Sequence, residues 1–127
     1  MVDIEKAHEI LDKIACELPR EFYKGLNGGI LLLPQAKLSP EALADDLYVL
    51  GEYVHDNSMG RLIYIYYGSF EKLFGNLDEK SLEEHLRDTL YHEFTHHMES
   101  LAGGMELEKK DEMQMREYRS RHNKSKT

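Results

Sequence analysis

Residues 81–101 read SLEEHLRDTLYHEFTHHMESL, and this stretch decides much of the fold. Its apolar residues recur every three or four positions, as on an α-helix with one face turned to a core. That face consists of Leu82, Leu86, Leu90, Phe94, Met98 and Leu101. Ser81 is the expected N-cap, with Glu84 completing a capping box. Gly103-Gly104 is expected to end the helix, because glycine accepts a left-handed C-cap conformation.

The same stretch contains an H-E-x-x-H motif formed by His92, Glu93 and His96. Histidines four residues apart lie one turn apart on one helical face, so both rings can reach one metal ion. Here that face is opposite to the apolar one. Glu93 points about 100° round the helix, where it can take a proton from a water that the metal activates. His97 points toward the core side, and we expect it to be packed or hydrogen-bonded.

A third metal ligand has to come from outside the motif. Catalytic zinc usually takes three protein ligands and leaves one position open. The familiar continuation to a third histidine is absent, since Ala102 stands at that place. A final helix, expected over residues 105–119, carries Asp111 within an apolar face, where a carboxylate needs a cation or strong hydrogen bonds. We therefore expect Asp111 to be the third ligand, with Glu108 in reserve; pairing of Asp111 with Lys, Arg or a backbone group is the alternative.

The rest of the chain predicts an α+β fold. Residues 3–18 have helical periodicity, and Ser39-Pro40 is expected to start a short helix. The apolar or tyrosine-rich stretches 30–33, 47–54 and 61–67 are expected to be strands. We expect a small, mostly antiparallel sheet of three strands, packed on the motif helix, with the first and last helices beside it. Residues 61–67 are expected to form an exposed edge that a substrate strand can join.

Length and composition predict a single domain over residues 1–127. The 41% hydrophobic content is that of a globular protein. The net charge of −8 argues against general nucleic-acid binding. Residues 116–127 hold five basic residues and one acid, and we expect a frayed basic tail.

Localisation follows from what the sequence lacks. It contains no run of 18 or more apolar residues, so no membrane-spanning helix is expected. The N-terminal residues 1–6 contain the acids Asp3 and Glu5 where a signal peptide would be basic and then apolar. The single Cys16 cannot form an internal disulfide and is typical of a reducing compartment. We expect a cytoplasmic protein.

Several stretches together resemble the small zincin-like metallopeptidase family of bacteria. The doubled histidine at His96 and His97 is characteristic of that family. The other matching features are Leu18-Pro19, Phe22, Leu26-Asn27, residues 50–53, residues 63–66 followed by Gly68 and a short helix, and residues 90–97. The resemblance implies a minimal zincin-like fold, zinc as cofactor and a peptide or protein substrate. This chain departs from the family by inserting residues 98–102 before Gly103, which leaves the third ligand open.

The function predicted is therefore that of a zinc metallopeptidase with His92 and His96 on the metal and Glu93 as general base. One alternative is a zinc-binding protein without peptidase activity, because so short a chain has little room for a specificity cleft and could need a partner or a homo-oligomer. The other is a metal-free helical interaction domain in which the motif arose by chance, since the chain is rich in His and Glu.

Overall fold

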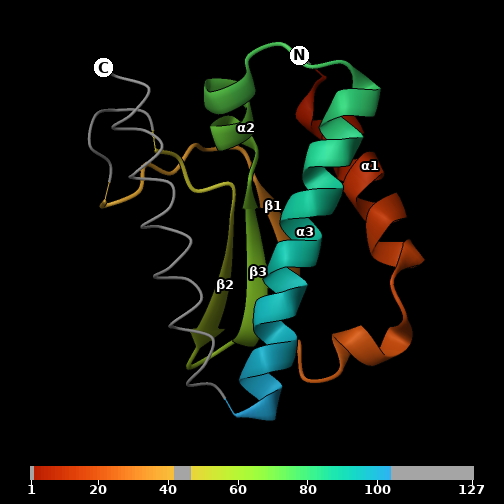
Figure 1. The fold of residues 1–127 in the computed structure, drawn as a ribbon, viewed down its shortest axis with the longest axis vertical. Helices are drawn as coiled ribbons and strands as arrows, with labels where there is room; N and C mark the ends of the chain where they lie inside the picture. The colour runs from red at the N-terminus through yellow and green to blue at the C-terminus, as the bar shows by residue number, and fades with distance from the viewer. Residues whose placement is uncertain (1, 42–46, 104–127) are drawn as a thin grey trace.

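The computed structural model describes residues 2–41 and 47–103, which form an α+β fold of helices packed on a small sheet (Figure 1). The helices are α1 (Ile4–Glu17), α2 (Tyr67–Phe74) and α3 (Glu79–Ala102), with a short 3-10 helix, η1, at Arg20–Tyr23. The strands are β1 (Gly29–Leu33), β2 (Gly51–Asp56) and β3 (Gly60–Tyr66). The predicted α+β class and three-stranded sheet are confirmed.

The sheet is mixed, with strand order β1-β3-β2. β2 and β3 form the expected hairpin, turning through Asp56–Gly60, whereas β1 pairs parallel to β3. The prediction of a mostly antiparallel sheet is therefore wrong for one of its two pairings. The end of β1 at Leu33 and the start of β2 at Gly51 lie beside the neighbouring β3 residues Tyr66 and Ile65, so β2 runs back antiparallel to β1, and β3 fills the place between them and runs parallel to β1.

β3 is the central strand, so the prediction that residues 61–67 form an exposed edge is wrong. Leu62, Ile63 and Ile65 of β3 are all fully buried, and the central position of the strand explains this burial. The edges of the described sheet are β1 and β2. β2 begins later than the predicted residue 47, because Tyr48 forms an antiparallel bridge with Leu38 instead of pairing with β3.

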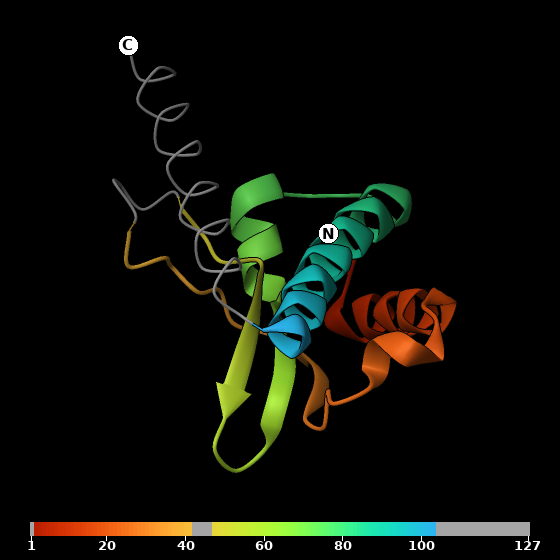
Figure 2. The ribbon, with the colours of Figure 1, turned by 60° about the horizontal axis from the view of Figure 1, so that its bottom comes forward.

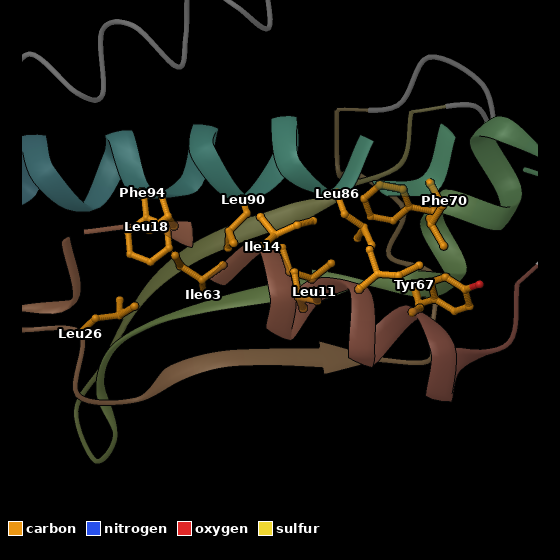
Figure 3. Close-up of a cluster of buried hydrophobic side chains, with 14 residues drawn as sticks. Leu11, Ile14, Leu18, Leu26, Ile63, Tyr67, Phe70, Leu86, Leu90 and Phe94 are labelled. Atoms are coloured by element: carbon orange, nitrogen blue, oxygen red, sulfur yellow. The ribbon is translucent and has the colours of Figure 1, made fainter. Parts of the chain in front are cut away.

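The core lies between one face of the sheet and the helices α1 and α3, which lie side by side over it (Figures 1 and 2). Figure 3 shows side chains of α1, β3, α2 and α3 meeting in this layer. α1 presents Ala7, Ile10, Leu11 and Ile14 to it at helical spacing. Its N-cap is Asp3, whose carboxylate accepts a hydrogen bond from the Lys6 N–H at 2.8 Å.

α3 begins earlier than expected. Its N-cap is Asp78, whose carboxylate accepts the backbone N–H of Ser81 at 2.8 Å, so the prediction of Ser81 as cap is wrong. Aspartate three residues before an unpaired N–H makes the same capping bond that serine would have made, one turn sooner. At the other end Gly103 is the C-cap with φ of 127°, as predicted.

Some predictions fall outside the described residues. The helix expected to start at Ser39-Pro40 would include residues 42–46, which the structure does not describe. The final helix expected at 105–119 and the basic tail expected at 116–127 also lie outside the described residues. None of the helices within residues 2–41 and 47–103 combines the length and apolarity needed to cross a membrane.

Candidate metal site

The two motif histidines point their rings at a common place. The Nε2 atoms of His92 and His96 are 2.9 Å apart, and the rings are nearly perpendicular, with centroids separated by 4.5 Å. His96 is buried and His92 is half-buried. The sequence prediction that the two imidazoles share one helical face and converge is confirmed.

This geometry fits a zinc ion. Zinc–imidazole bonds of about 2.0–2.1 Å place two nitrogens of a tetrahedral site about 3.3 Å apart. The observed 2.9 Å would have to open by only about 0.4 Å. Small changes in the side-chain torsions of two rings one helical turn apart provide such an opening. Imidazole nitrogens are also donors that zinc prefers.

Glu93 follows His92 on α3, and its side chain lies against the edge strand β2. Its side chain is 5% exposed. A Cβ built on Gly51 would stand 3.1 Å from the Cγ and 3.3 Å from the Oε2 of Glu93, and 2.7 Å from the Cγ2 of Thr89. Glycine at position 51 therefore leaves the space that the Glu93 carboxylate fills. A buried carboxylate one residue from a pair of converging histidines is of the kind that accepts and donates protons in catalysis.

The two remaining motif positions have opposite environments. Phe94 is buried in the core, where its ring meets those of Phe22 and Tyr23 at centroid distances of 6.1 and 5.1 Å. Burial raises the pKa of the Tyr23 phenol, with a smaller contribution from Cys16. Thr95 is exposed, and its hydroxyl donates to the carbonyl of Tyr91. One side of the motif thus anchors the helix and the other carries the polar groups.

His97 is fully buried and hydrogen-bonded, as predicted for a residue on the core side. Its Nε2 lies 2.8 Å from the carbonyl oxygen of Lys24, and its Nδ1 lies 2.8 Å from the hydroxyl of Tyr53. His85 stacks on Phe74 at a centroid distance of 3.9 Å. Neither residue joins the His92–His96 pair.

The residues that the structure describes show no third ligand for a metal ion beside the two histidines. In residues 2–41 and 47–103 no third His, Cys, Asp or Glu joins the pair in a group able to hold a metal ion. Asp111 and Glu108, the predicted candidates, lie outside those residues.

Sequence reasoning missed Gly51 and Tyr53, which approach α3 from β2. The signal was present, because an isolated glycine inside a strand pattern often marks a close backbone approach. The sequence could not tell what approaches it, since Gly51 and Glu93 are 42 positions apart.

Comparison with known proteins gives a relative of known structure. No family model matches the chain, and no curated protein does. A solved structure, that of a conserved hypothetical protein from Thermus thermophilus, is 33% identical, with a TM-score of 0.67. The match covers 80% of this chain and 98% of the other. This chain belongs to the same protein family as that conserved hypothetical protein.

Proposed function

We propose that this protein is a zinc-dependent metallopeptidase of the zincin type. The observation that carries the proposal is the 2.9 Å approach of the His92 and His96 Nε2 atoms, with the Glu93 carboxylate buried on the neighbouring position of the same helix. His92 and His96 would hold the ion. Asp111, or Glu108 in its place, is proposed as the third ligand from the sequence pattern.

The proposed roles of the metal ion and of Glu93 follow from the positions of the side chains. Zinc, when bound, supplies a Lewis acid that lowers the pKa of a water and polarises a carbonyl group. Glu93 accepts the proton of the attacking water at its carboxylate and later delivers that proton to the leaving amine. Burial of this carboxylate against Gly51 restricts it to few orientations.

Among the described strands, β2 offers an outer edge to which an extended peptide can add. The Tyr66 N–H donates to the Leu50 carbonyl, and facing pairs alternate in an antiparallel ladder. The backbone N–H and C=O groups of Gly51, Tyr53 and His55 therefore point away from β3. A peptide strand adding to this edge would lie beside Glu93, because Gly51 contacts that side chain.

The alternative for the histidine pair is a direct hydrogen bond between the two rings, which 2.9 Å also allows. In that case the chain is a metal-free interaction domain. Metal analysis of the full chain, purified without added zinc, separates these cases. We expect about one zinc per chain, and a preparation that cannot be loaded with zinc would contradict the proposal.

Catalysis is tested with Glu93→Gln in a peptide-library assay. The amide has nearly the same shape but cannot accept the proton, so zinc should stay bound while cleavage falls at least about 100-fold. Glu84→Gln, a change of the same kind nine residues earlier on α3, is the matched control. If Glu93→Gln cleaves as fast as the wild type, or if the zinc-loaded wild type cleaves nothing, the protein is a non-catalytic zinc-binding protein.

A further inference from the structure

A buried histidine that the proposed reaction does not use stands directly after the second metal-binding residue. His97 is 0% exposed and contacts two other elements. One contact is with Lys24 in the loop after η1, and the other is with Tyr53 on β2. A buried polar ring with both nitrogens bonded is specified in orientation, since losing either bond leaves a polar atom without its partner.

Both ring nitrogens of His97 have a defined partner. The Lys24 carbonyl oxygen can only accept, so the Nε2 of His97 carries the proton and donates to it. The Nδ1 of His97 forms its hydrogen bond with the Tyr53 hydroxyl. Tyr53 contacts His97 in two ways. Its hydroxyl forms the hydrogen bond with Nδ1, and its ring lies at a centroid distance of 5.4 Å from the imidazole.

The contact between His97 and Tyr53 lies about one helical turn along α3 from the contact between Glu93 and Gly51. Glu93 and His97 are four residues apart on α3, a rise of about 6.0 Å, and therefore share a face. Their partners Gly51 and Tyr53 are two residues apart on β2, about 6.6 Å, and also share a face. The two contacts can form together only in one register of helix on strand. A rotation or a slide of α3 that broke the His97 bond would also move Glu93 away from Gly51.

β2 is itself held from its other face. Glu52 accepts hydrogen bonds from the Lys37 ammonium group at 2.8 Å to each carboxylate oxygen, and from the Tyr66 hydroxyl at 2.8 Å. Burial, and then the Glu52 carboxylate, raises the pKa of the Tyr66 phenol, so the hydroxyl remains a donor. With β2 fixed on β3, the His97 contact acts on the placement of α3.

We propose that His97 is a positioning residue, which through the Tyr53 hydroxyl and the Lys24 carbonyl sets the rotation of α3 on β2 and so places the Glu93 carboxylate beside Gly51. This inference rests on the proposed function, since it assigns Glu93 the role of general base.

The test compares Tyr53→Phe with Tyr64→Phe in the full chain. Tyr53→Phe keeps the ring and removes only the hydroxyl that bonds His97. Tyr64→Phe is the same chemical change on the opposite face of the sheet, because Tyr64 alternates with the core residues Ile63 and Ile65. Each variant is loaded with cobalt(II), and acetohydroxamate is titrated while the visible cobalt absorption is followed. A hydroxamate binds the metal and gives a proton to a neighbouring carboxylate, so its affinity reports the position of Glu93 without turnover.

We expect all three proteins to bind one cobalt, because His92 and His96 move together on α3. Acetohydroxamate should bind Tyr53→Phe about 5- to 20-fold more weakly than wild type. Its kcat should fall about 10- to 100-fold, as small misplacements of a catalytic group do, with KM within about twofold. Tyr64→Phe should match the wild type in each respect. His97→Asn, whose amide oxygen can take the place of Nδ1, should recover more hydroxamate affinity than His97→Ala.

The outcomes distinguish a failure of the positioning role of His97 from a failure of the proposed function. If Tyr53→Phe and Tyr64→Phe bind acetohydroxamate equally well, or if Tyr53→Phe loses thermal stability only, His97 has no positioning role while the proposed function stands. If Tyr53→Phe does not fold, the comparison of His97→Asn with His97→Ala decides in the same way. A wild type that binds no cobalt overturns the proposed function, and the positioning role with it.

Discussion

Gly51 and Thr89 are in contact across the joint between β2 and α3: a Cβ on Gly51 would come within 2.7 Å of the Cγ2 of Thr89. The edge strand and the motif helix therefore approach as closely as a glycine allows. The same missing side chain leaves the space for Glu93.

Gly51→Ala should accordingly lower both stability and activity. The added methyl group would push α3 from β2 or displace the Glu93 side chain, and overpacking of this kind costs about 1–3 kcal/mol. We expect kcat to fall about 10- to 100-fold with zinc still bound. Thermal unfolding, zinc content and peptide cleavage measure the three effects. Val54→Ala, on the opposite face of β2, should leave kcat unchanged; equal activities of the two variants would show that the Gly51 contact does not place Glu93.

The histidine pair should account for metal binding. His92→Ala and His96→Ala each remove one of the two converging nitrogens, so zinc affinity should fall by at least about 100-fold, more than is usual for losing a group that only orients a ligand. His85→Ala changes a histidine on the same helix that stacks on Phe74, and should keep one zinc per chain. Chelator competition measures the affinities. Unchanged zinc binding in His96→Ala would exclude the site.

The third ligand can be assigned by two changes outside the described residues. Asp111→Asn removes the charge of the carboxylate predicted to bind zinc, so the affinity should fall at least about 10-fold. Glu108→Gln is the matched change at the reserve position, three residues earlier, and should have little effect. The reverse order of effects would assign the ligand role to Glu108, and no effect of either change would require a ligand from elsewhere.

The two unspecified positions of the motif should separate folding from chemistry. Phe94→Ala empties a core position against Phe22 and Tyr23 and should cost about 3–5 kcal/mol of unfolding free energy. Thr95→Ala, at the exposed neighbouring position, should stay within about 0.5 kcal/mol. Denaturant unfolding of the zinc-free proteins measures both values. Similar costs at the two positions would contradict the orientation of α3.

The N-cap of α3 should make stability depend on pH in the acid range. The hydrogen bond from the Ser81 N–H, first among several causes, lowers the pKa of Asp78 below its ordinary value of 3.8. The folded state therefore favours the ionised carboxylate. Its contribution is fully present above the unfolded value and is lost as the pH falls through the lower, folded value. Asp78→Asn keeps a cap but cannot titrate, so its melting temperature should fall less steeply than that of the wild type below pH 3.8. Parallel melting curves of the two proteins would contradict this role.

Much of the helix and the site could be predicted from the sequence because the relevant relations are local. The spacing of Leu82, Leu86, Leu90 and Phe94 specified the buried face of α3, and the spacing of His92 and His96 specified their convergence. Gly103 as C-cap and the turn at 56–60 follow from glycine conformation and turn composition. Such relations span a few residues, within which backbone geometry alone sets the distances.

The sheet order and the surroundings of Glu93 depend on contacts between distant segments, which no local pattern encodes. The tyrosine-rich sequence of 61–67 would suit an edge or a centre equally well, and only the pairing of β1 with β3 made it central. Gly51, Tyr53 and Lys24 reach α3 from elements 42, 44 and 73 residues away from their partners. The sequence determined that two imidazoles and a carboxylate share one helix; the tertiary structure decided which strand lies against that carboxylate, because packing between distant segments depends on the whole core.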